Sequence, residues 1–129
     1  MTRPRDRKYL ETHEWARKDG DAIVVGITDH AVSELGELVF CAIKAKAGDR
    51  VTKGEPFGEI ESVKAVSDLN SPVNGTIVEV NGGIADALDL VAQDPFNAGW
   101  MIRVKPAADS GFEKLLDADA YEKHVASAH

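Results

Sequence analysis

Residues 58–80, GEIESVKAVSDLNSPVNGTIVEV, decide how the middle of this chain folds. The stretch contains β-type segments rich in Val and Ile, and Ser71-Pro72 and Asn74-Gly75 supply turn residues after them. Lys64 lies between two such segments among small or branched apolar residues, where a bare turn calls for Gly, Asn or Asp. The stretch therefore predicts a strand on each side of Lys64.

Short strands and turns continue on both sides of this stretch. A hairpin is predicted from Tyr9, with Asp19-Gly20 supplying the positive-φ positions of its turn. A helix of about two turns is predicted next, with Thr28 or Asp29 as N-cap and Gly36 as its stop. The other predicted strands cover residues 37–45, 54–63, 65–73, 75–80 and 100–106, and a short helix with a loop is predicted within 82–100.

The end of the chain has a different pattern. Residues 110–129 show helical periodicity, with Asp109 or Ser110 as the predicted cap. Short strands at regular spacing are typical of an all-β sandwich or a small barrel. We therefore predict one domain over residues 1–129: a mainly β core with an N-terminal hairpin, a short helix and C-terminal helices.

Composition excludes several classes of partner. The chain has 15 basic and 22 acidic residues and a formal charge of −7, which disfavours nucleic acid. Its apolar runs are far shorter than the roughly 20 residues that span a bilayer, so no membrane segment is expected. Cys41 is the only cysteine, which fits a reducing compartment. We expect a cytoplasmic protein, or a mature organellar one.

The usual catalytic motifs are missing, so the chain is not expected to be an enzyme. It has no Gly-x-Ser-x-Gly elbow, no phosphate-binding glycine loop, no His-Glu-x-x-His pair and no Cys-x-x-Cys. Its four histidines lack metal-ligand spacing, and no metal site is predicted. Cys41 lies in the apolar segment LVFCAI and is interpreted as a small core residue.

Lys64 remains as the candidate functional residue, with two interpretations. It is either an ordinary solvated lysine or an amine fixed at a hairpin tip for a modifying enzyme. A prosthetic group in amide linkage would remove the lysine's charge and extend its reach. Such a change suits a protein that carries a group between the active sites of other proteins.

Several motifs resemble the glycine cleavage system H-protein family of lipoyl carriers. These motifs are HEWAR, VGITDHAVSELGELVF, GEPFGEIESVKA, DPFNAGWM and LLDADAYEKH, together with ESVKAVSDLNSPVNGTIVEVN. The resemblance runs from about Lys8 to His124 in the expected order. It implies a barrel-sandwich hybrid fold of the lipoyl/biotinyl type. It also implies that Lys64 carries covalent lipoate as N6-lipoyllysine.

The resemblance further implies a shuttle in glycine catabolism and one-carbon metabolism. The arm would take an aminomethyl group from glycine decarboxylase (P protein) to aminomethyltransferase (T protein) and electrons to dihydrolipoamide dehydrogenase (L protein). A lipoate ligase or a lipoyl/octanoyl transferase would load it. Thr12, Glu14 and Asp68 align with the cleft that receives the loaded arm, although Glu14 could be a solvated strand residue and Asp68 a turn cap. Location would be the bacterial cytoplasm or the mitochondrial matrix.

Some segments depart from the family pattern. CAIKAKAG at 41–48, VNGG at 80–83 and Ala98 after Asp94-Pro95-Phe96 replace more usual residues, which puts in doubt partner contacts through these loops. Lipoyl domains of 2-oxo-acid dehydrogenases typically show DKA and biotinyl domains MKM, whereas this chain has VKA. An H-like protein that relays lipoate to other enzymes, or an unmodified binding or scaffold domain, remains an alternative.

Overall fold

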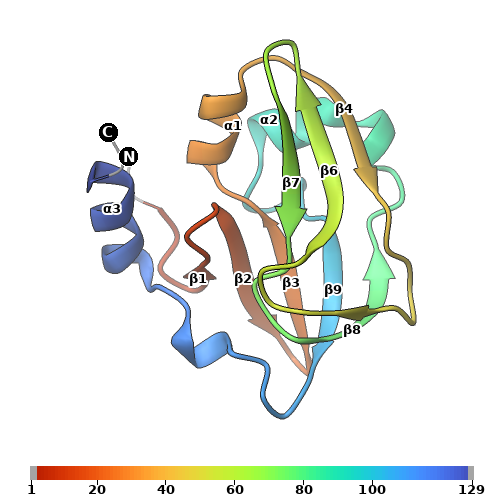
Figure 1. Cartoon of the computed structure of the whole chain (residues 1–129), viewed down its shortest axis with the longest axis vertical. Helices are drawn as coiled ribbons and strands as arrows, with labels where there is room; N and C mark the ends of the chain where they lie inside the picture. Colours follow the sequence, from red (N-terminus) through yellow and green to blue (C-terminus); the bar gives the residue numbers. More distant parts are fainter. Residues whose placement is uncertain (1–2, 128–129) are drawn as a thin grey trace.

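The computed structural model describes residues 3–127, whose strands form two antiparallel β-sheets (Figure 1). The larger sheet has six strands in the order β1-β2-β3-β9-β8-β5, and the smaller has three in the order β4-β6-β7. The predicted mainly β fold is confirmed. The strands are β1 (Lys8–Tyr9), β2 (Glu14–Asp19), β3 (Ala22–Ile27), β4 (Leu38–Ile43), β5 (Arg50–Val51), β6 (Pro56–Ser62), β7 (Val66–Asn70), β8 (Gly75–Val80) and β9 (Ile102–Pro106).

Within the described residues, three α-helices and two 3-10 helices complete the architecture. Helix α1 (Asp29–Leu35) connects the two sheets, and η1 (Ile84–Asp86) with α2 (Leu88–Gln93) lies between β8 and β9. The chain ends with η2 (Phe112–Lys114) and α3 (Ala118–Ser127). No helix within residues 3–127 is long and apolar enough to cross a membrane.

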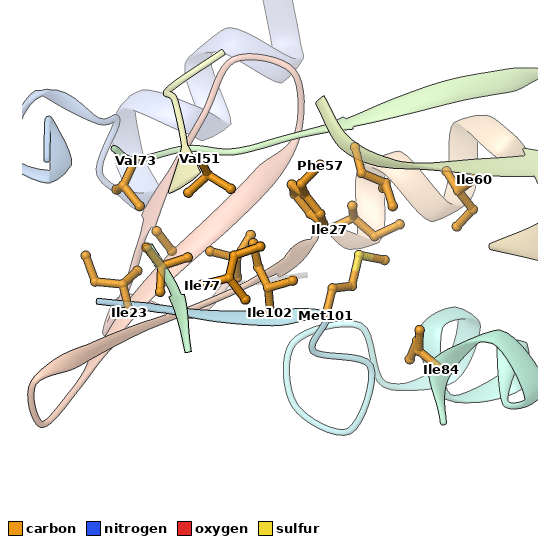
Figure 2. Packing of buried hydrophobic residues seen from close by; sticks show 14 of the residues in the cluster. Ile23, Ile27, Val51, Phe57, Ile60, Val73, Ile77, Ile84, Met101 and Ile102 are labelled. Atoms are coloured by element: carbon orange, nitrogen blue, oxygen red, sulfur yellow. The ribbon is translucent and has the colours of Figure 1, made fainter. Parts of the chain in front are cut away.

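The main core fills the space between the two sheets. Figure 2 shows Phe57 of β6 beside Ile27 of the large sheet, with Ile23 and Ile60 toward opposite ends of the cluster and Ile102 between them. Each of these side chains is at most 2% exposed, so each contributes about 1.5–3 kcal/mol relative to an exposed position. This packing holds β6, and with it the Lys64 hairpin, against the large sheet.

A second apolar cluster lies under helix α3 on the other face of the large sheet. Val24 of β3 points into it, so β3 is buried on both faces, which explains its continuous apolar run AIVVGI. The Tyr9 and Tyr121 rings stack there with centroids 4.7 Å apart. The Tyr121 hydroxyl also lies 2.8 Å from Thr28 Oγ1, so α3 is tied to the start of α1.

Local signals at the first hairpin and helix are largely confirmed. Gly20 turns the hairpin with φ 61°, although Asp19 has no positive φ and pairs with Ala22. Thr28 caps α1 through a 3.2 Å hydrogen bond that its Oγ1 accepts from the Ala31 N–H, and Gly36 ends the helix at φ 81°. The predicted short helix within 82–100 is present as α2.

Two predicted elements are wrong in their extent. The segment from Tyr9 is not one strand: His13 adopts φ 82°, which separates β1 from β2. The continuous helix predicted over residues 110–127 is also absent, because Leu116 forms a β-bridge with Tyr9 and α3 begins only at Ala118. Residues 128 and 129 of that prediction lie outside the described residues.

Candidate functional site

Lys64 lies at the tip of the hairpin formed by β6 and β7. The last paired residues are Glu61 and Val66, and the chain reverses over residues 62–65 with a 2.8 Å hydrogen bond from the Ser62 N–H to the Ala65 carbonyl. Residues 63–66 are all exposed. Figure 1 shows this tip projecting beyond the body of the molecule, beside the connection from α1 to β4. The prediction of a strand on each side of Lys64 is confirmed.

The hairpin tip rests on the end of helix α1. The Val63 N–H donates a 3.0 Å hydrogen bond to the Glu37 carbonyl. The Lys64 Cε lies 3.9 Å from the point where a Cβ on Gly36 would stand, so the missing side chain leaves room beside the lysine stem. Gly36 therefore has two uses, since its positive φ ends the helix and its backbone borders the candidate site.

The Lys64 amine is available for chemistry. Among the ion pairs within residues 3–127, none involves Lys64. Lys44, by contrast, is engaged in an ion pair, with its Nζ 3.4 Å from Glu59 Oε1. An exposed amine on a fixed backbone is the arrangement that an acylating enzyme can reach.

Glu14 is buried, with its side chain bound at both oxygens. It is 2% exposed, Thr12 Oγ1 donates to its Oε1 at 2.5 Å, and the Asn70 N–H donates to its Oε2 at 2.9 Å. Burial raises the pKa of the carboxyl to about 7, against the lowering effect of these hydrogen bonds. The interpretation of Glu14 as a solvated strand residue is therefore wrong.

The structure joins two of the three predicted cleft residues directly. Thr12 and Glu14 share a hydrogen bond, whereas Asp68 is exposed on β7 and pairs with Glu59. Asp68 is thus a strand residue and not a turn cap. It lies two residues, roughly 7 Å, along β7 from Asn70, the residue that Glu14 contacts. Sequence reasoning missed Asn70 because its backbone N–H makes the contact.

Cys41 and the histidines are the other potentially reactive groups. Cys41 is buried as predicted, and burial raises the pKa of its thiol to about 11. His13 lies beside His30 and His124, with ring centroids 4.6 and 5.9 Å away, and its Nδ1 is 2.7 Å from the Tyr121 hydroxyl. Even so, no group of His, Cys, Asp or Glu within residues 3–127 has a geometry that could hold a metal ion. The fourth histidine lies outside those residues.

Comparisons with known proteins agree on one family. A family model described as "Glycine cleavage H-protein" matches residues 7–128. A probable glycine cleavage system H protein from Natronomonas pharaonis is 50% identical over 123 residues, covering 95% of this chain and 96% of that protein. A mitochondrial one from Oryza sativa subsp. indica is 47% identical over 117 residues, covering 91% of this chain and 71% of that protein.

A solved structure supports the same relationship at the level of the fold. The crystal structure of a glycine cleavage system H protein from Mycobacterium marinum superposes with a TM-score of 0.87. It is 42% identical in sequence and covers 96% of this chain and 99% of its own. The two-sheet architecture described above is thus consistent with the predicted barrel-sandwich hybrid.

Proposed function

Because this chain belongs to the glycine cleavage H-protein family, we propose that it is the lipoyl-bearing shuttle of a glycine cleavage system, with lipoate in amide linkage on Lys64. The observation that carries the proposal is the position of Lys64, exposed at the tip of a strand hairpin in a chain of this family. Family membership also agrees with the prediction that the protein is a carrier and not an enzyme.

The residues at the hairpin tip fit a covalent arm. Lys64 has a free amine, its neighbours on β7 are exposed, and Gly36 contributes no side chain beside it. Amide formation there costs no ion pair, since Lys64 takes part in none among residues 3–127. When attached, lipoate supplies the dithiolane that accepts a one-carbon unit and electrons. The protein's part is to present this group and to shelter it.

Thr12, Glu14 and Asp68 are proposed to form the wall against which the arm docks. The Glu14 carboxylate contacts Asn70 on β7, and Asp68 lies on the same strand. This strand runs from the Lys64 tip back toward the large sheet (Figure 1). A carboxyl whose pKa is about 7 is only half ionised near neutral pH. An arriving cation favours the ionised form, so a positively charged group on the arm would be held more firmly than a neutral one.

The proposed partners follow from the proposed role. They are glycine decarboxylase, aminomethyltransferase and dihydrolipoamide dehydrogenase, together with a lipoate ligase or a lipoyl/octanoyl transferase that loads Lys64. The protein would work where these enzymes do, in the cytoplasm of a bacterium or in the mitochondrial matrix. Its net charge of −7 favours partner surfaces that are basic around their active-site entrances.

The test is site-resolved modification by a lipoate ligase with ATP and lipoate. Peptide mapping by mass spectrometry should place the lipoyl increment on Lys64 and nowhere else. Lys64→Arg should abolish loading and change the free energy of unfolding by less than about 0.5 kcal/mol, because the residue is exposed. Lys44→Arg is the matched control, since Lys44 is also exposed and directly follows β4 of the same sheet. An increment on Lys44, or none on Lys64, would refute the assignment.

A reconstituted system separates glycine cleavage from the relay alternative. Loaded protein should support glycine-dependent reduction of NAD⁺ when combined with the three partner enzymes and tetrahydrofolate as the one-carbon acceptor, and the Lys64→Arg variant should not. If loaded protein fails in this assay yet gives up its lipoate to a second lipoyl domain when a lipoyl transferase is added, the relay function is correct instead.

A further inference from the structure

Ser62 is a buried polar residue two positions before an exposed lysine. It is 7% exposed, whereas residues 63–66 are all exposed. Its hydroxyl oxygen accepts hydrogen bonds from the Lys64 N–H at 3.3 Å and from the Ala65 N–H at 3.1 Å, and it donates to the Ala65 carbonyl at 3.4 Å. One serine side chain thus binds the backbone of the residue that carries the amine and of the residue after it.

These contacts complete the hydrogen bonding of the tip backbone. The Val63 N–H binds the Glu37 carbonyl from outside the hairpin, and the Ser62 N–H binds the Ala65 carbonyl. With the two bonds to Ser62 Oγ, all four N–H groups of residues 62–65 have acceptors. A tip with exposed side chains and bound N–H groups is ordered without any help from the side chains of Lys64 or its exposed neighbours.

We propose that Ser62 is a positioning residue for the modification of Lys64, a proposal that rests on the lipoyl-carrier function above. Modification forms an amide bond between Lys64 Nζ and the carboxyl carbon of an activated acyl donor, such as an acyl adenylate. The bond to the leaving group breaks, the leaving group departs with the electron pair, and the amine loses a proton. Ser62 touches none of these atoms and acts through the Lys64 backbone.

The advantage of this arrangement is that the tip is ordered before the modifying enzyme binds. A flexible tip would have to be ordered during binding, which weakens the encounter, whereas a pre-ordered tip avoids this cost. Losing Ser62 Oγ removes two hydrogen bonds to N–H groups at the tip. The expected effect is on KM and not on kcat, because the chemistry at Nζ is unchanged.

The experiment uses full-length variants and a lipoate ligase with ATP and lipoate. Ser62→Ala should raise KM for the carrier about tenfold, equivalent to about 1.4 kcal/mol, with kcat nearly unchanged. In the unmodified protein, the Lys64 and Ala65 amides should exchange with solvent faster, as read by NMR. Ser62→Thr retains the hydroxyl and should restore both measurements. Ser67→Ala is the control, because Ser67 is exposed on the same hairpin and its hydroxyl donates a 3.5 Å hydrogen bond to the Asp68 carbonyl, away from the tip backbone.

Each outcome decides between named alternatives. An unchanged KM with faster amide exchange would overturn the proposal and leave Ser62 with a purely structural role. A raised KM with unchanged exchange would also overturn it, because the enzyme would then read the hydroxyl directly. If Ser62→Ala does not fold, Ser62→Thr and Ser62→Val have nearly equal shape and differ in the hydroxyl, so equal KM values for these two would overturn it. No modification of the unaltered protein would refute the lipoyl-carrier function, while amide exchange would still report on the Ser62 hydrogen bonds.

Discussion

Replacing Glu14 by glutamine should stabilise the protein in a way that grows with pH. The Glu14 carboxyl has its pKa raised from 4.5 to about 7 by burial. A folded state that holds a proton more tightly than the unfolded chain loses stability as pH rises through this window. A glutamine side chain cannot ionise, so the variant escapes that loss. Its amide can also replace both hydrogen bonds, accepting from the Asn70 N–H and donating to Thr12 Oγ1.

The magnitude follows from the rise in pKa. Well below pH 4.5 the Glu14 carboxyl is protonated in both the folded and the unfolded protein. The difference in free energy of unfolding between Glu14→Gln and the parent protein is therefore constant there. From there to well above pH 7 the difference should grow in favour of Glu14→Gln by about 3 kcal/mol. The group is 2% exposed, so solvent screening removes little of this energy.

Urea unfolding between pH 4 and pH 9, followed by tryptophan fluorescence, measures the effect. At each pH, subtracting the parent's free energy of unfolding from the variant's cancels the contributions of the titratable groups that the two proteins share. Glu11→Gln is the matched control, because Glu11 is an exposed glutamate in the same segment. A flat difference for Glu14→Gln would show that the two hydrogen bonds offset the effect of burial on the carboxyl's pKa, and a variant that becomes less stable as pH rises would show that they outweigh it.

Three further predictions concern close packing and acid stability. Gly75→Val should lower the free energy of unfolding, measured in urea, by about 2–3 kcal/mol, because a Cβ would lie 2.5 Å from Val104 Cγ1. The same variant should also be lipoylated less. An unchanged free energy of unfolding would show that β9 moves aside. Gly26→Ala should lower the free energy of unfolding by about 1–3 kcal/mol, since its Cβ would stand 2.7 Å from the Trp15 ring. A Tm equal to that of the parent protein would contradict this. Burial and two nearby imidazoles lower the pKa of His13 from 6.5 to about 4, so stability should fall as pH drops through that range. His13→Asn, which tolerates positive φ, should reduce that acid loss by about 1–2 kcal/mol after allowance for partial exposure, and an unchanged acid slope would count against it.

Local chemistry made part of the fold predictable. The two ends of helix α1 could be predicted at Thr28 and Gly36, because N-capping and a left-handed C-terminal residue depend only on residues within one turn. The error at residues 110–117 has a tertiary cause: the Leu115-Leu116 pair fits helical spacing, yet the Leu116 backbone pairs with Tyr9 far away in sequence. Asp117 then supplies the cap, accepting from the Ala120 N–H at 2.8 Å. Asn74-Gly75 was predicted to supply turn residues, but Gly75 is already the first residue of β8, has no positive φ and is constrained by its close approach to β9.

In the candidate site, too, the features set by local sequence could be predicted and those set by distant contacts could not. Lys64 could be found because a lysine between two strands is unusual and the surrounding motif belongs to a family. The buried state of Glu14 could not be found, because its partner is the backbone of Asn70, 56 residues away. The contribution of Ser62 was equally hidden, since a serine at a strand end has many ordinary uses and only the geometry shows its two acceptor bonds.

The position of β9 in the large sheet has a consequence for how the chain folds during synthesis. This strand, residues 102–106, is inserted between β3 and β8, which both precede it in sequence. Until it leaves the ribosome, the first hairpin and the β8 region have no strand to join them, and each exposes an unpaired edge. The lysine hairpin is synthesised some forty residues earlier, but the sheet that supports it closes late. A modifying enzyme that requires the folded tip would therefore act on the completed chain and not on the nascent one.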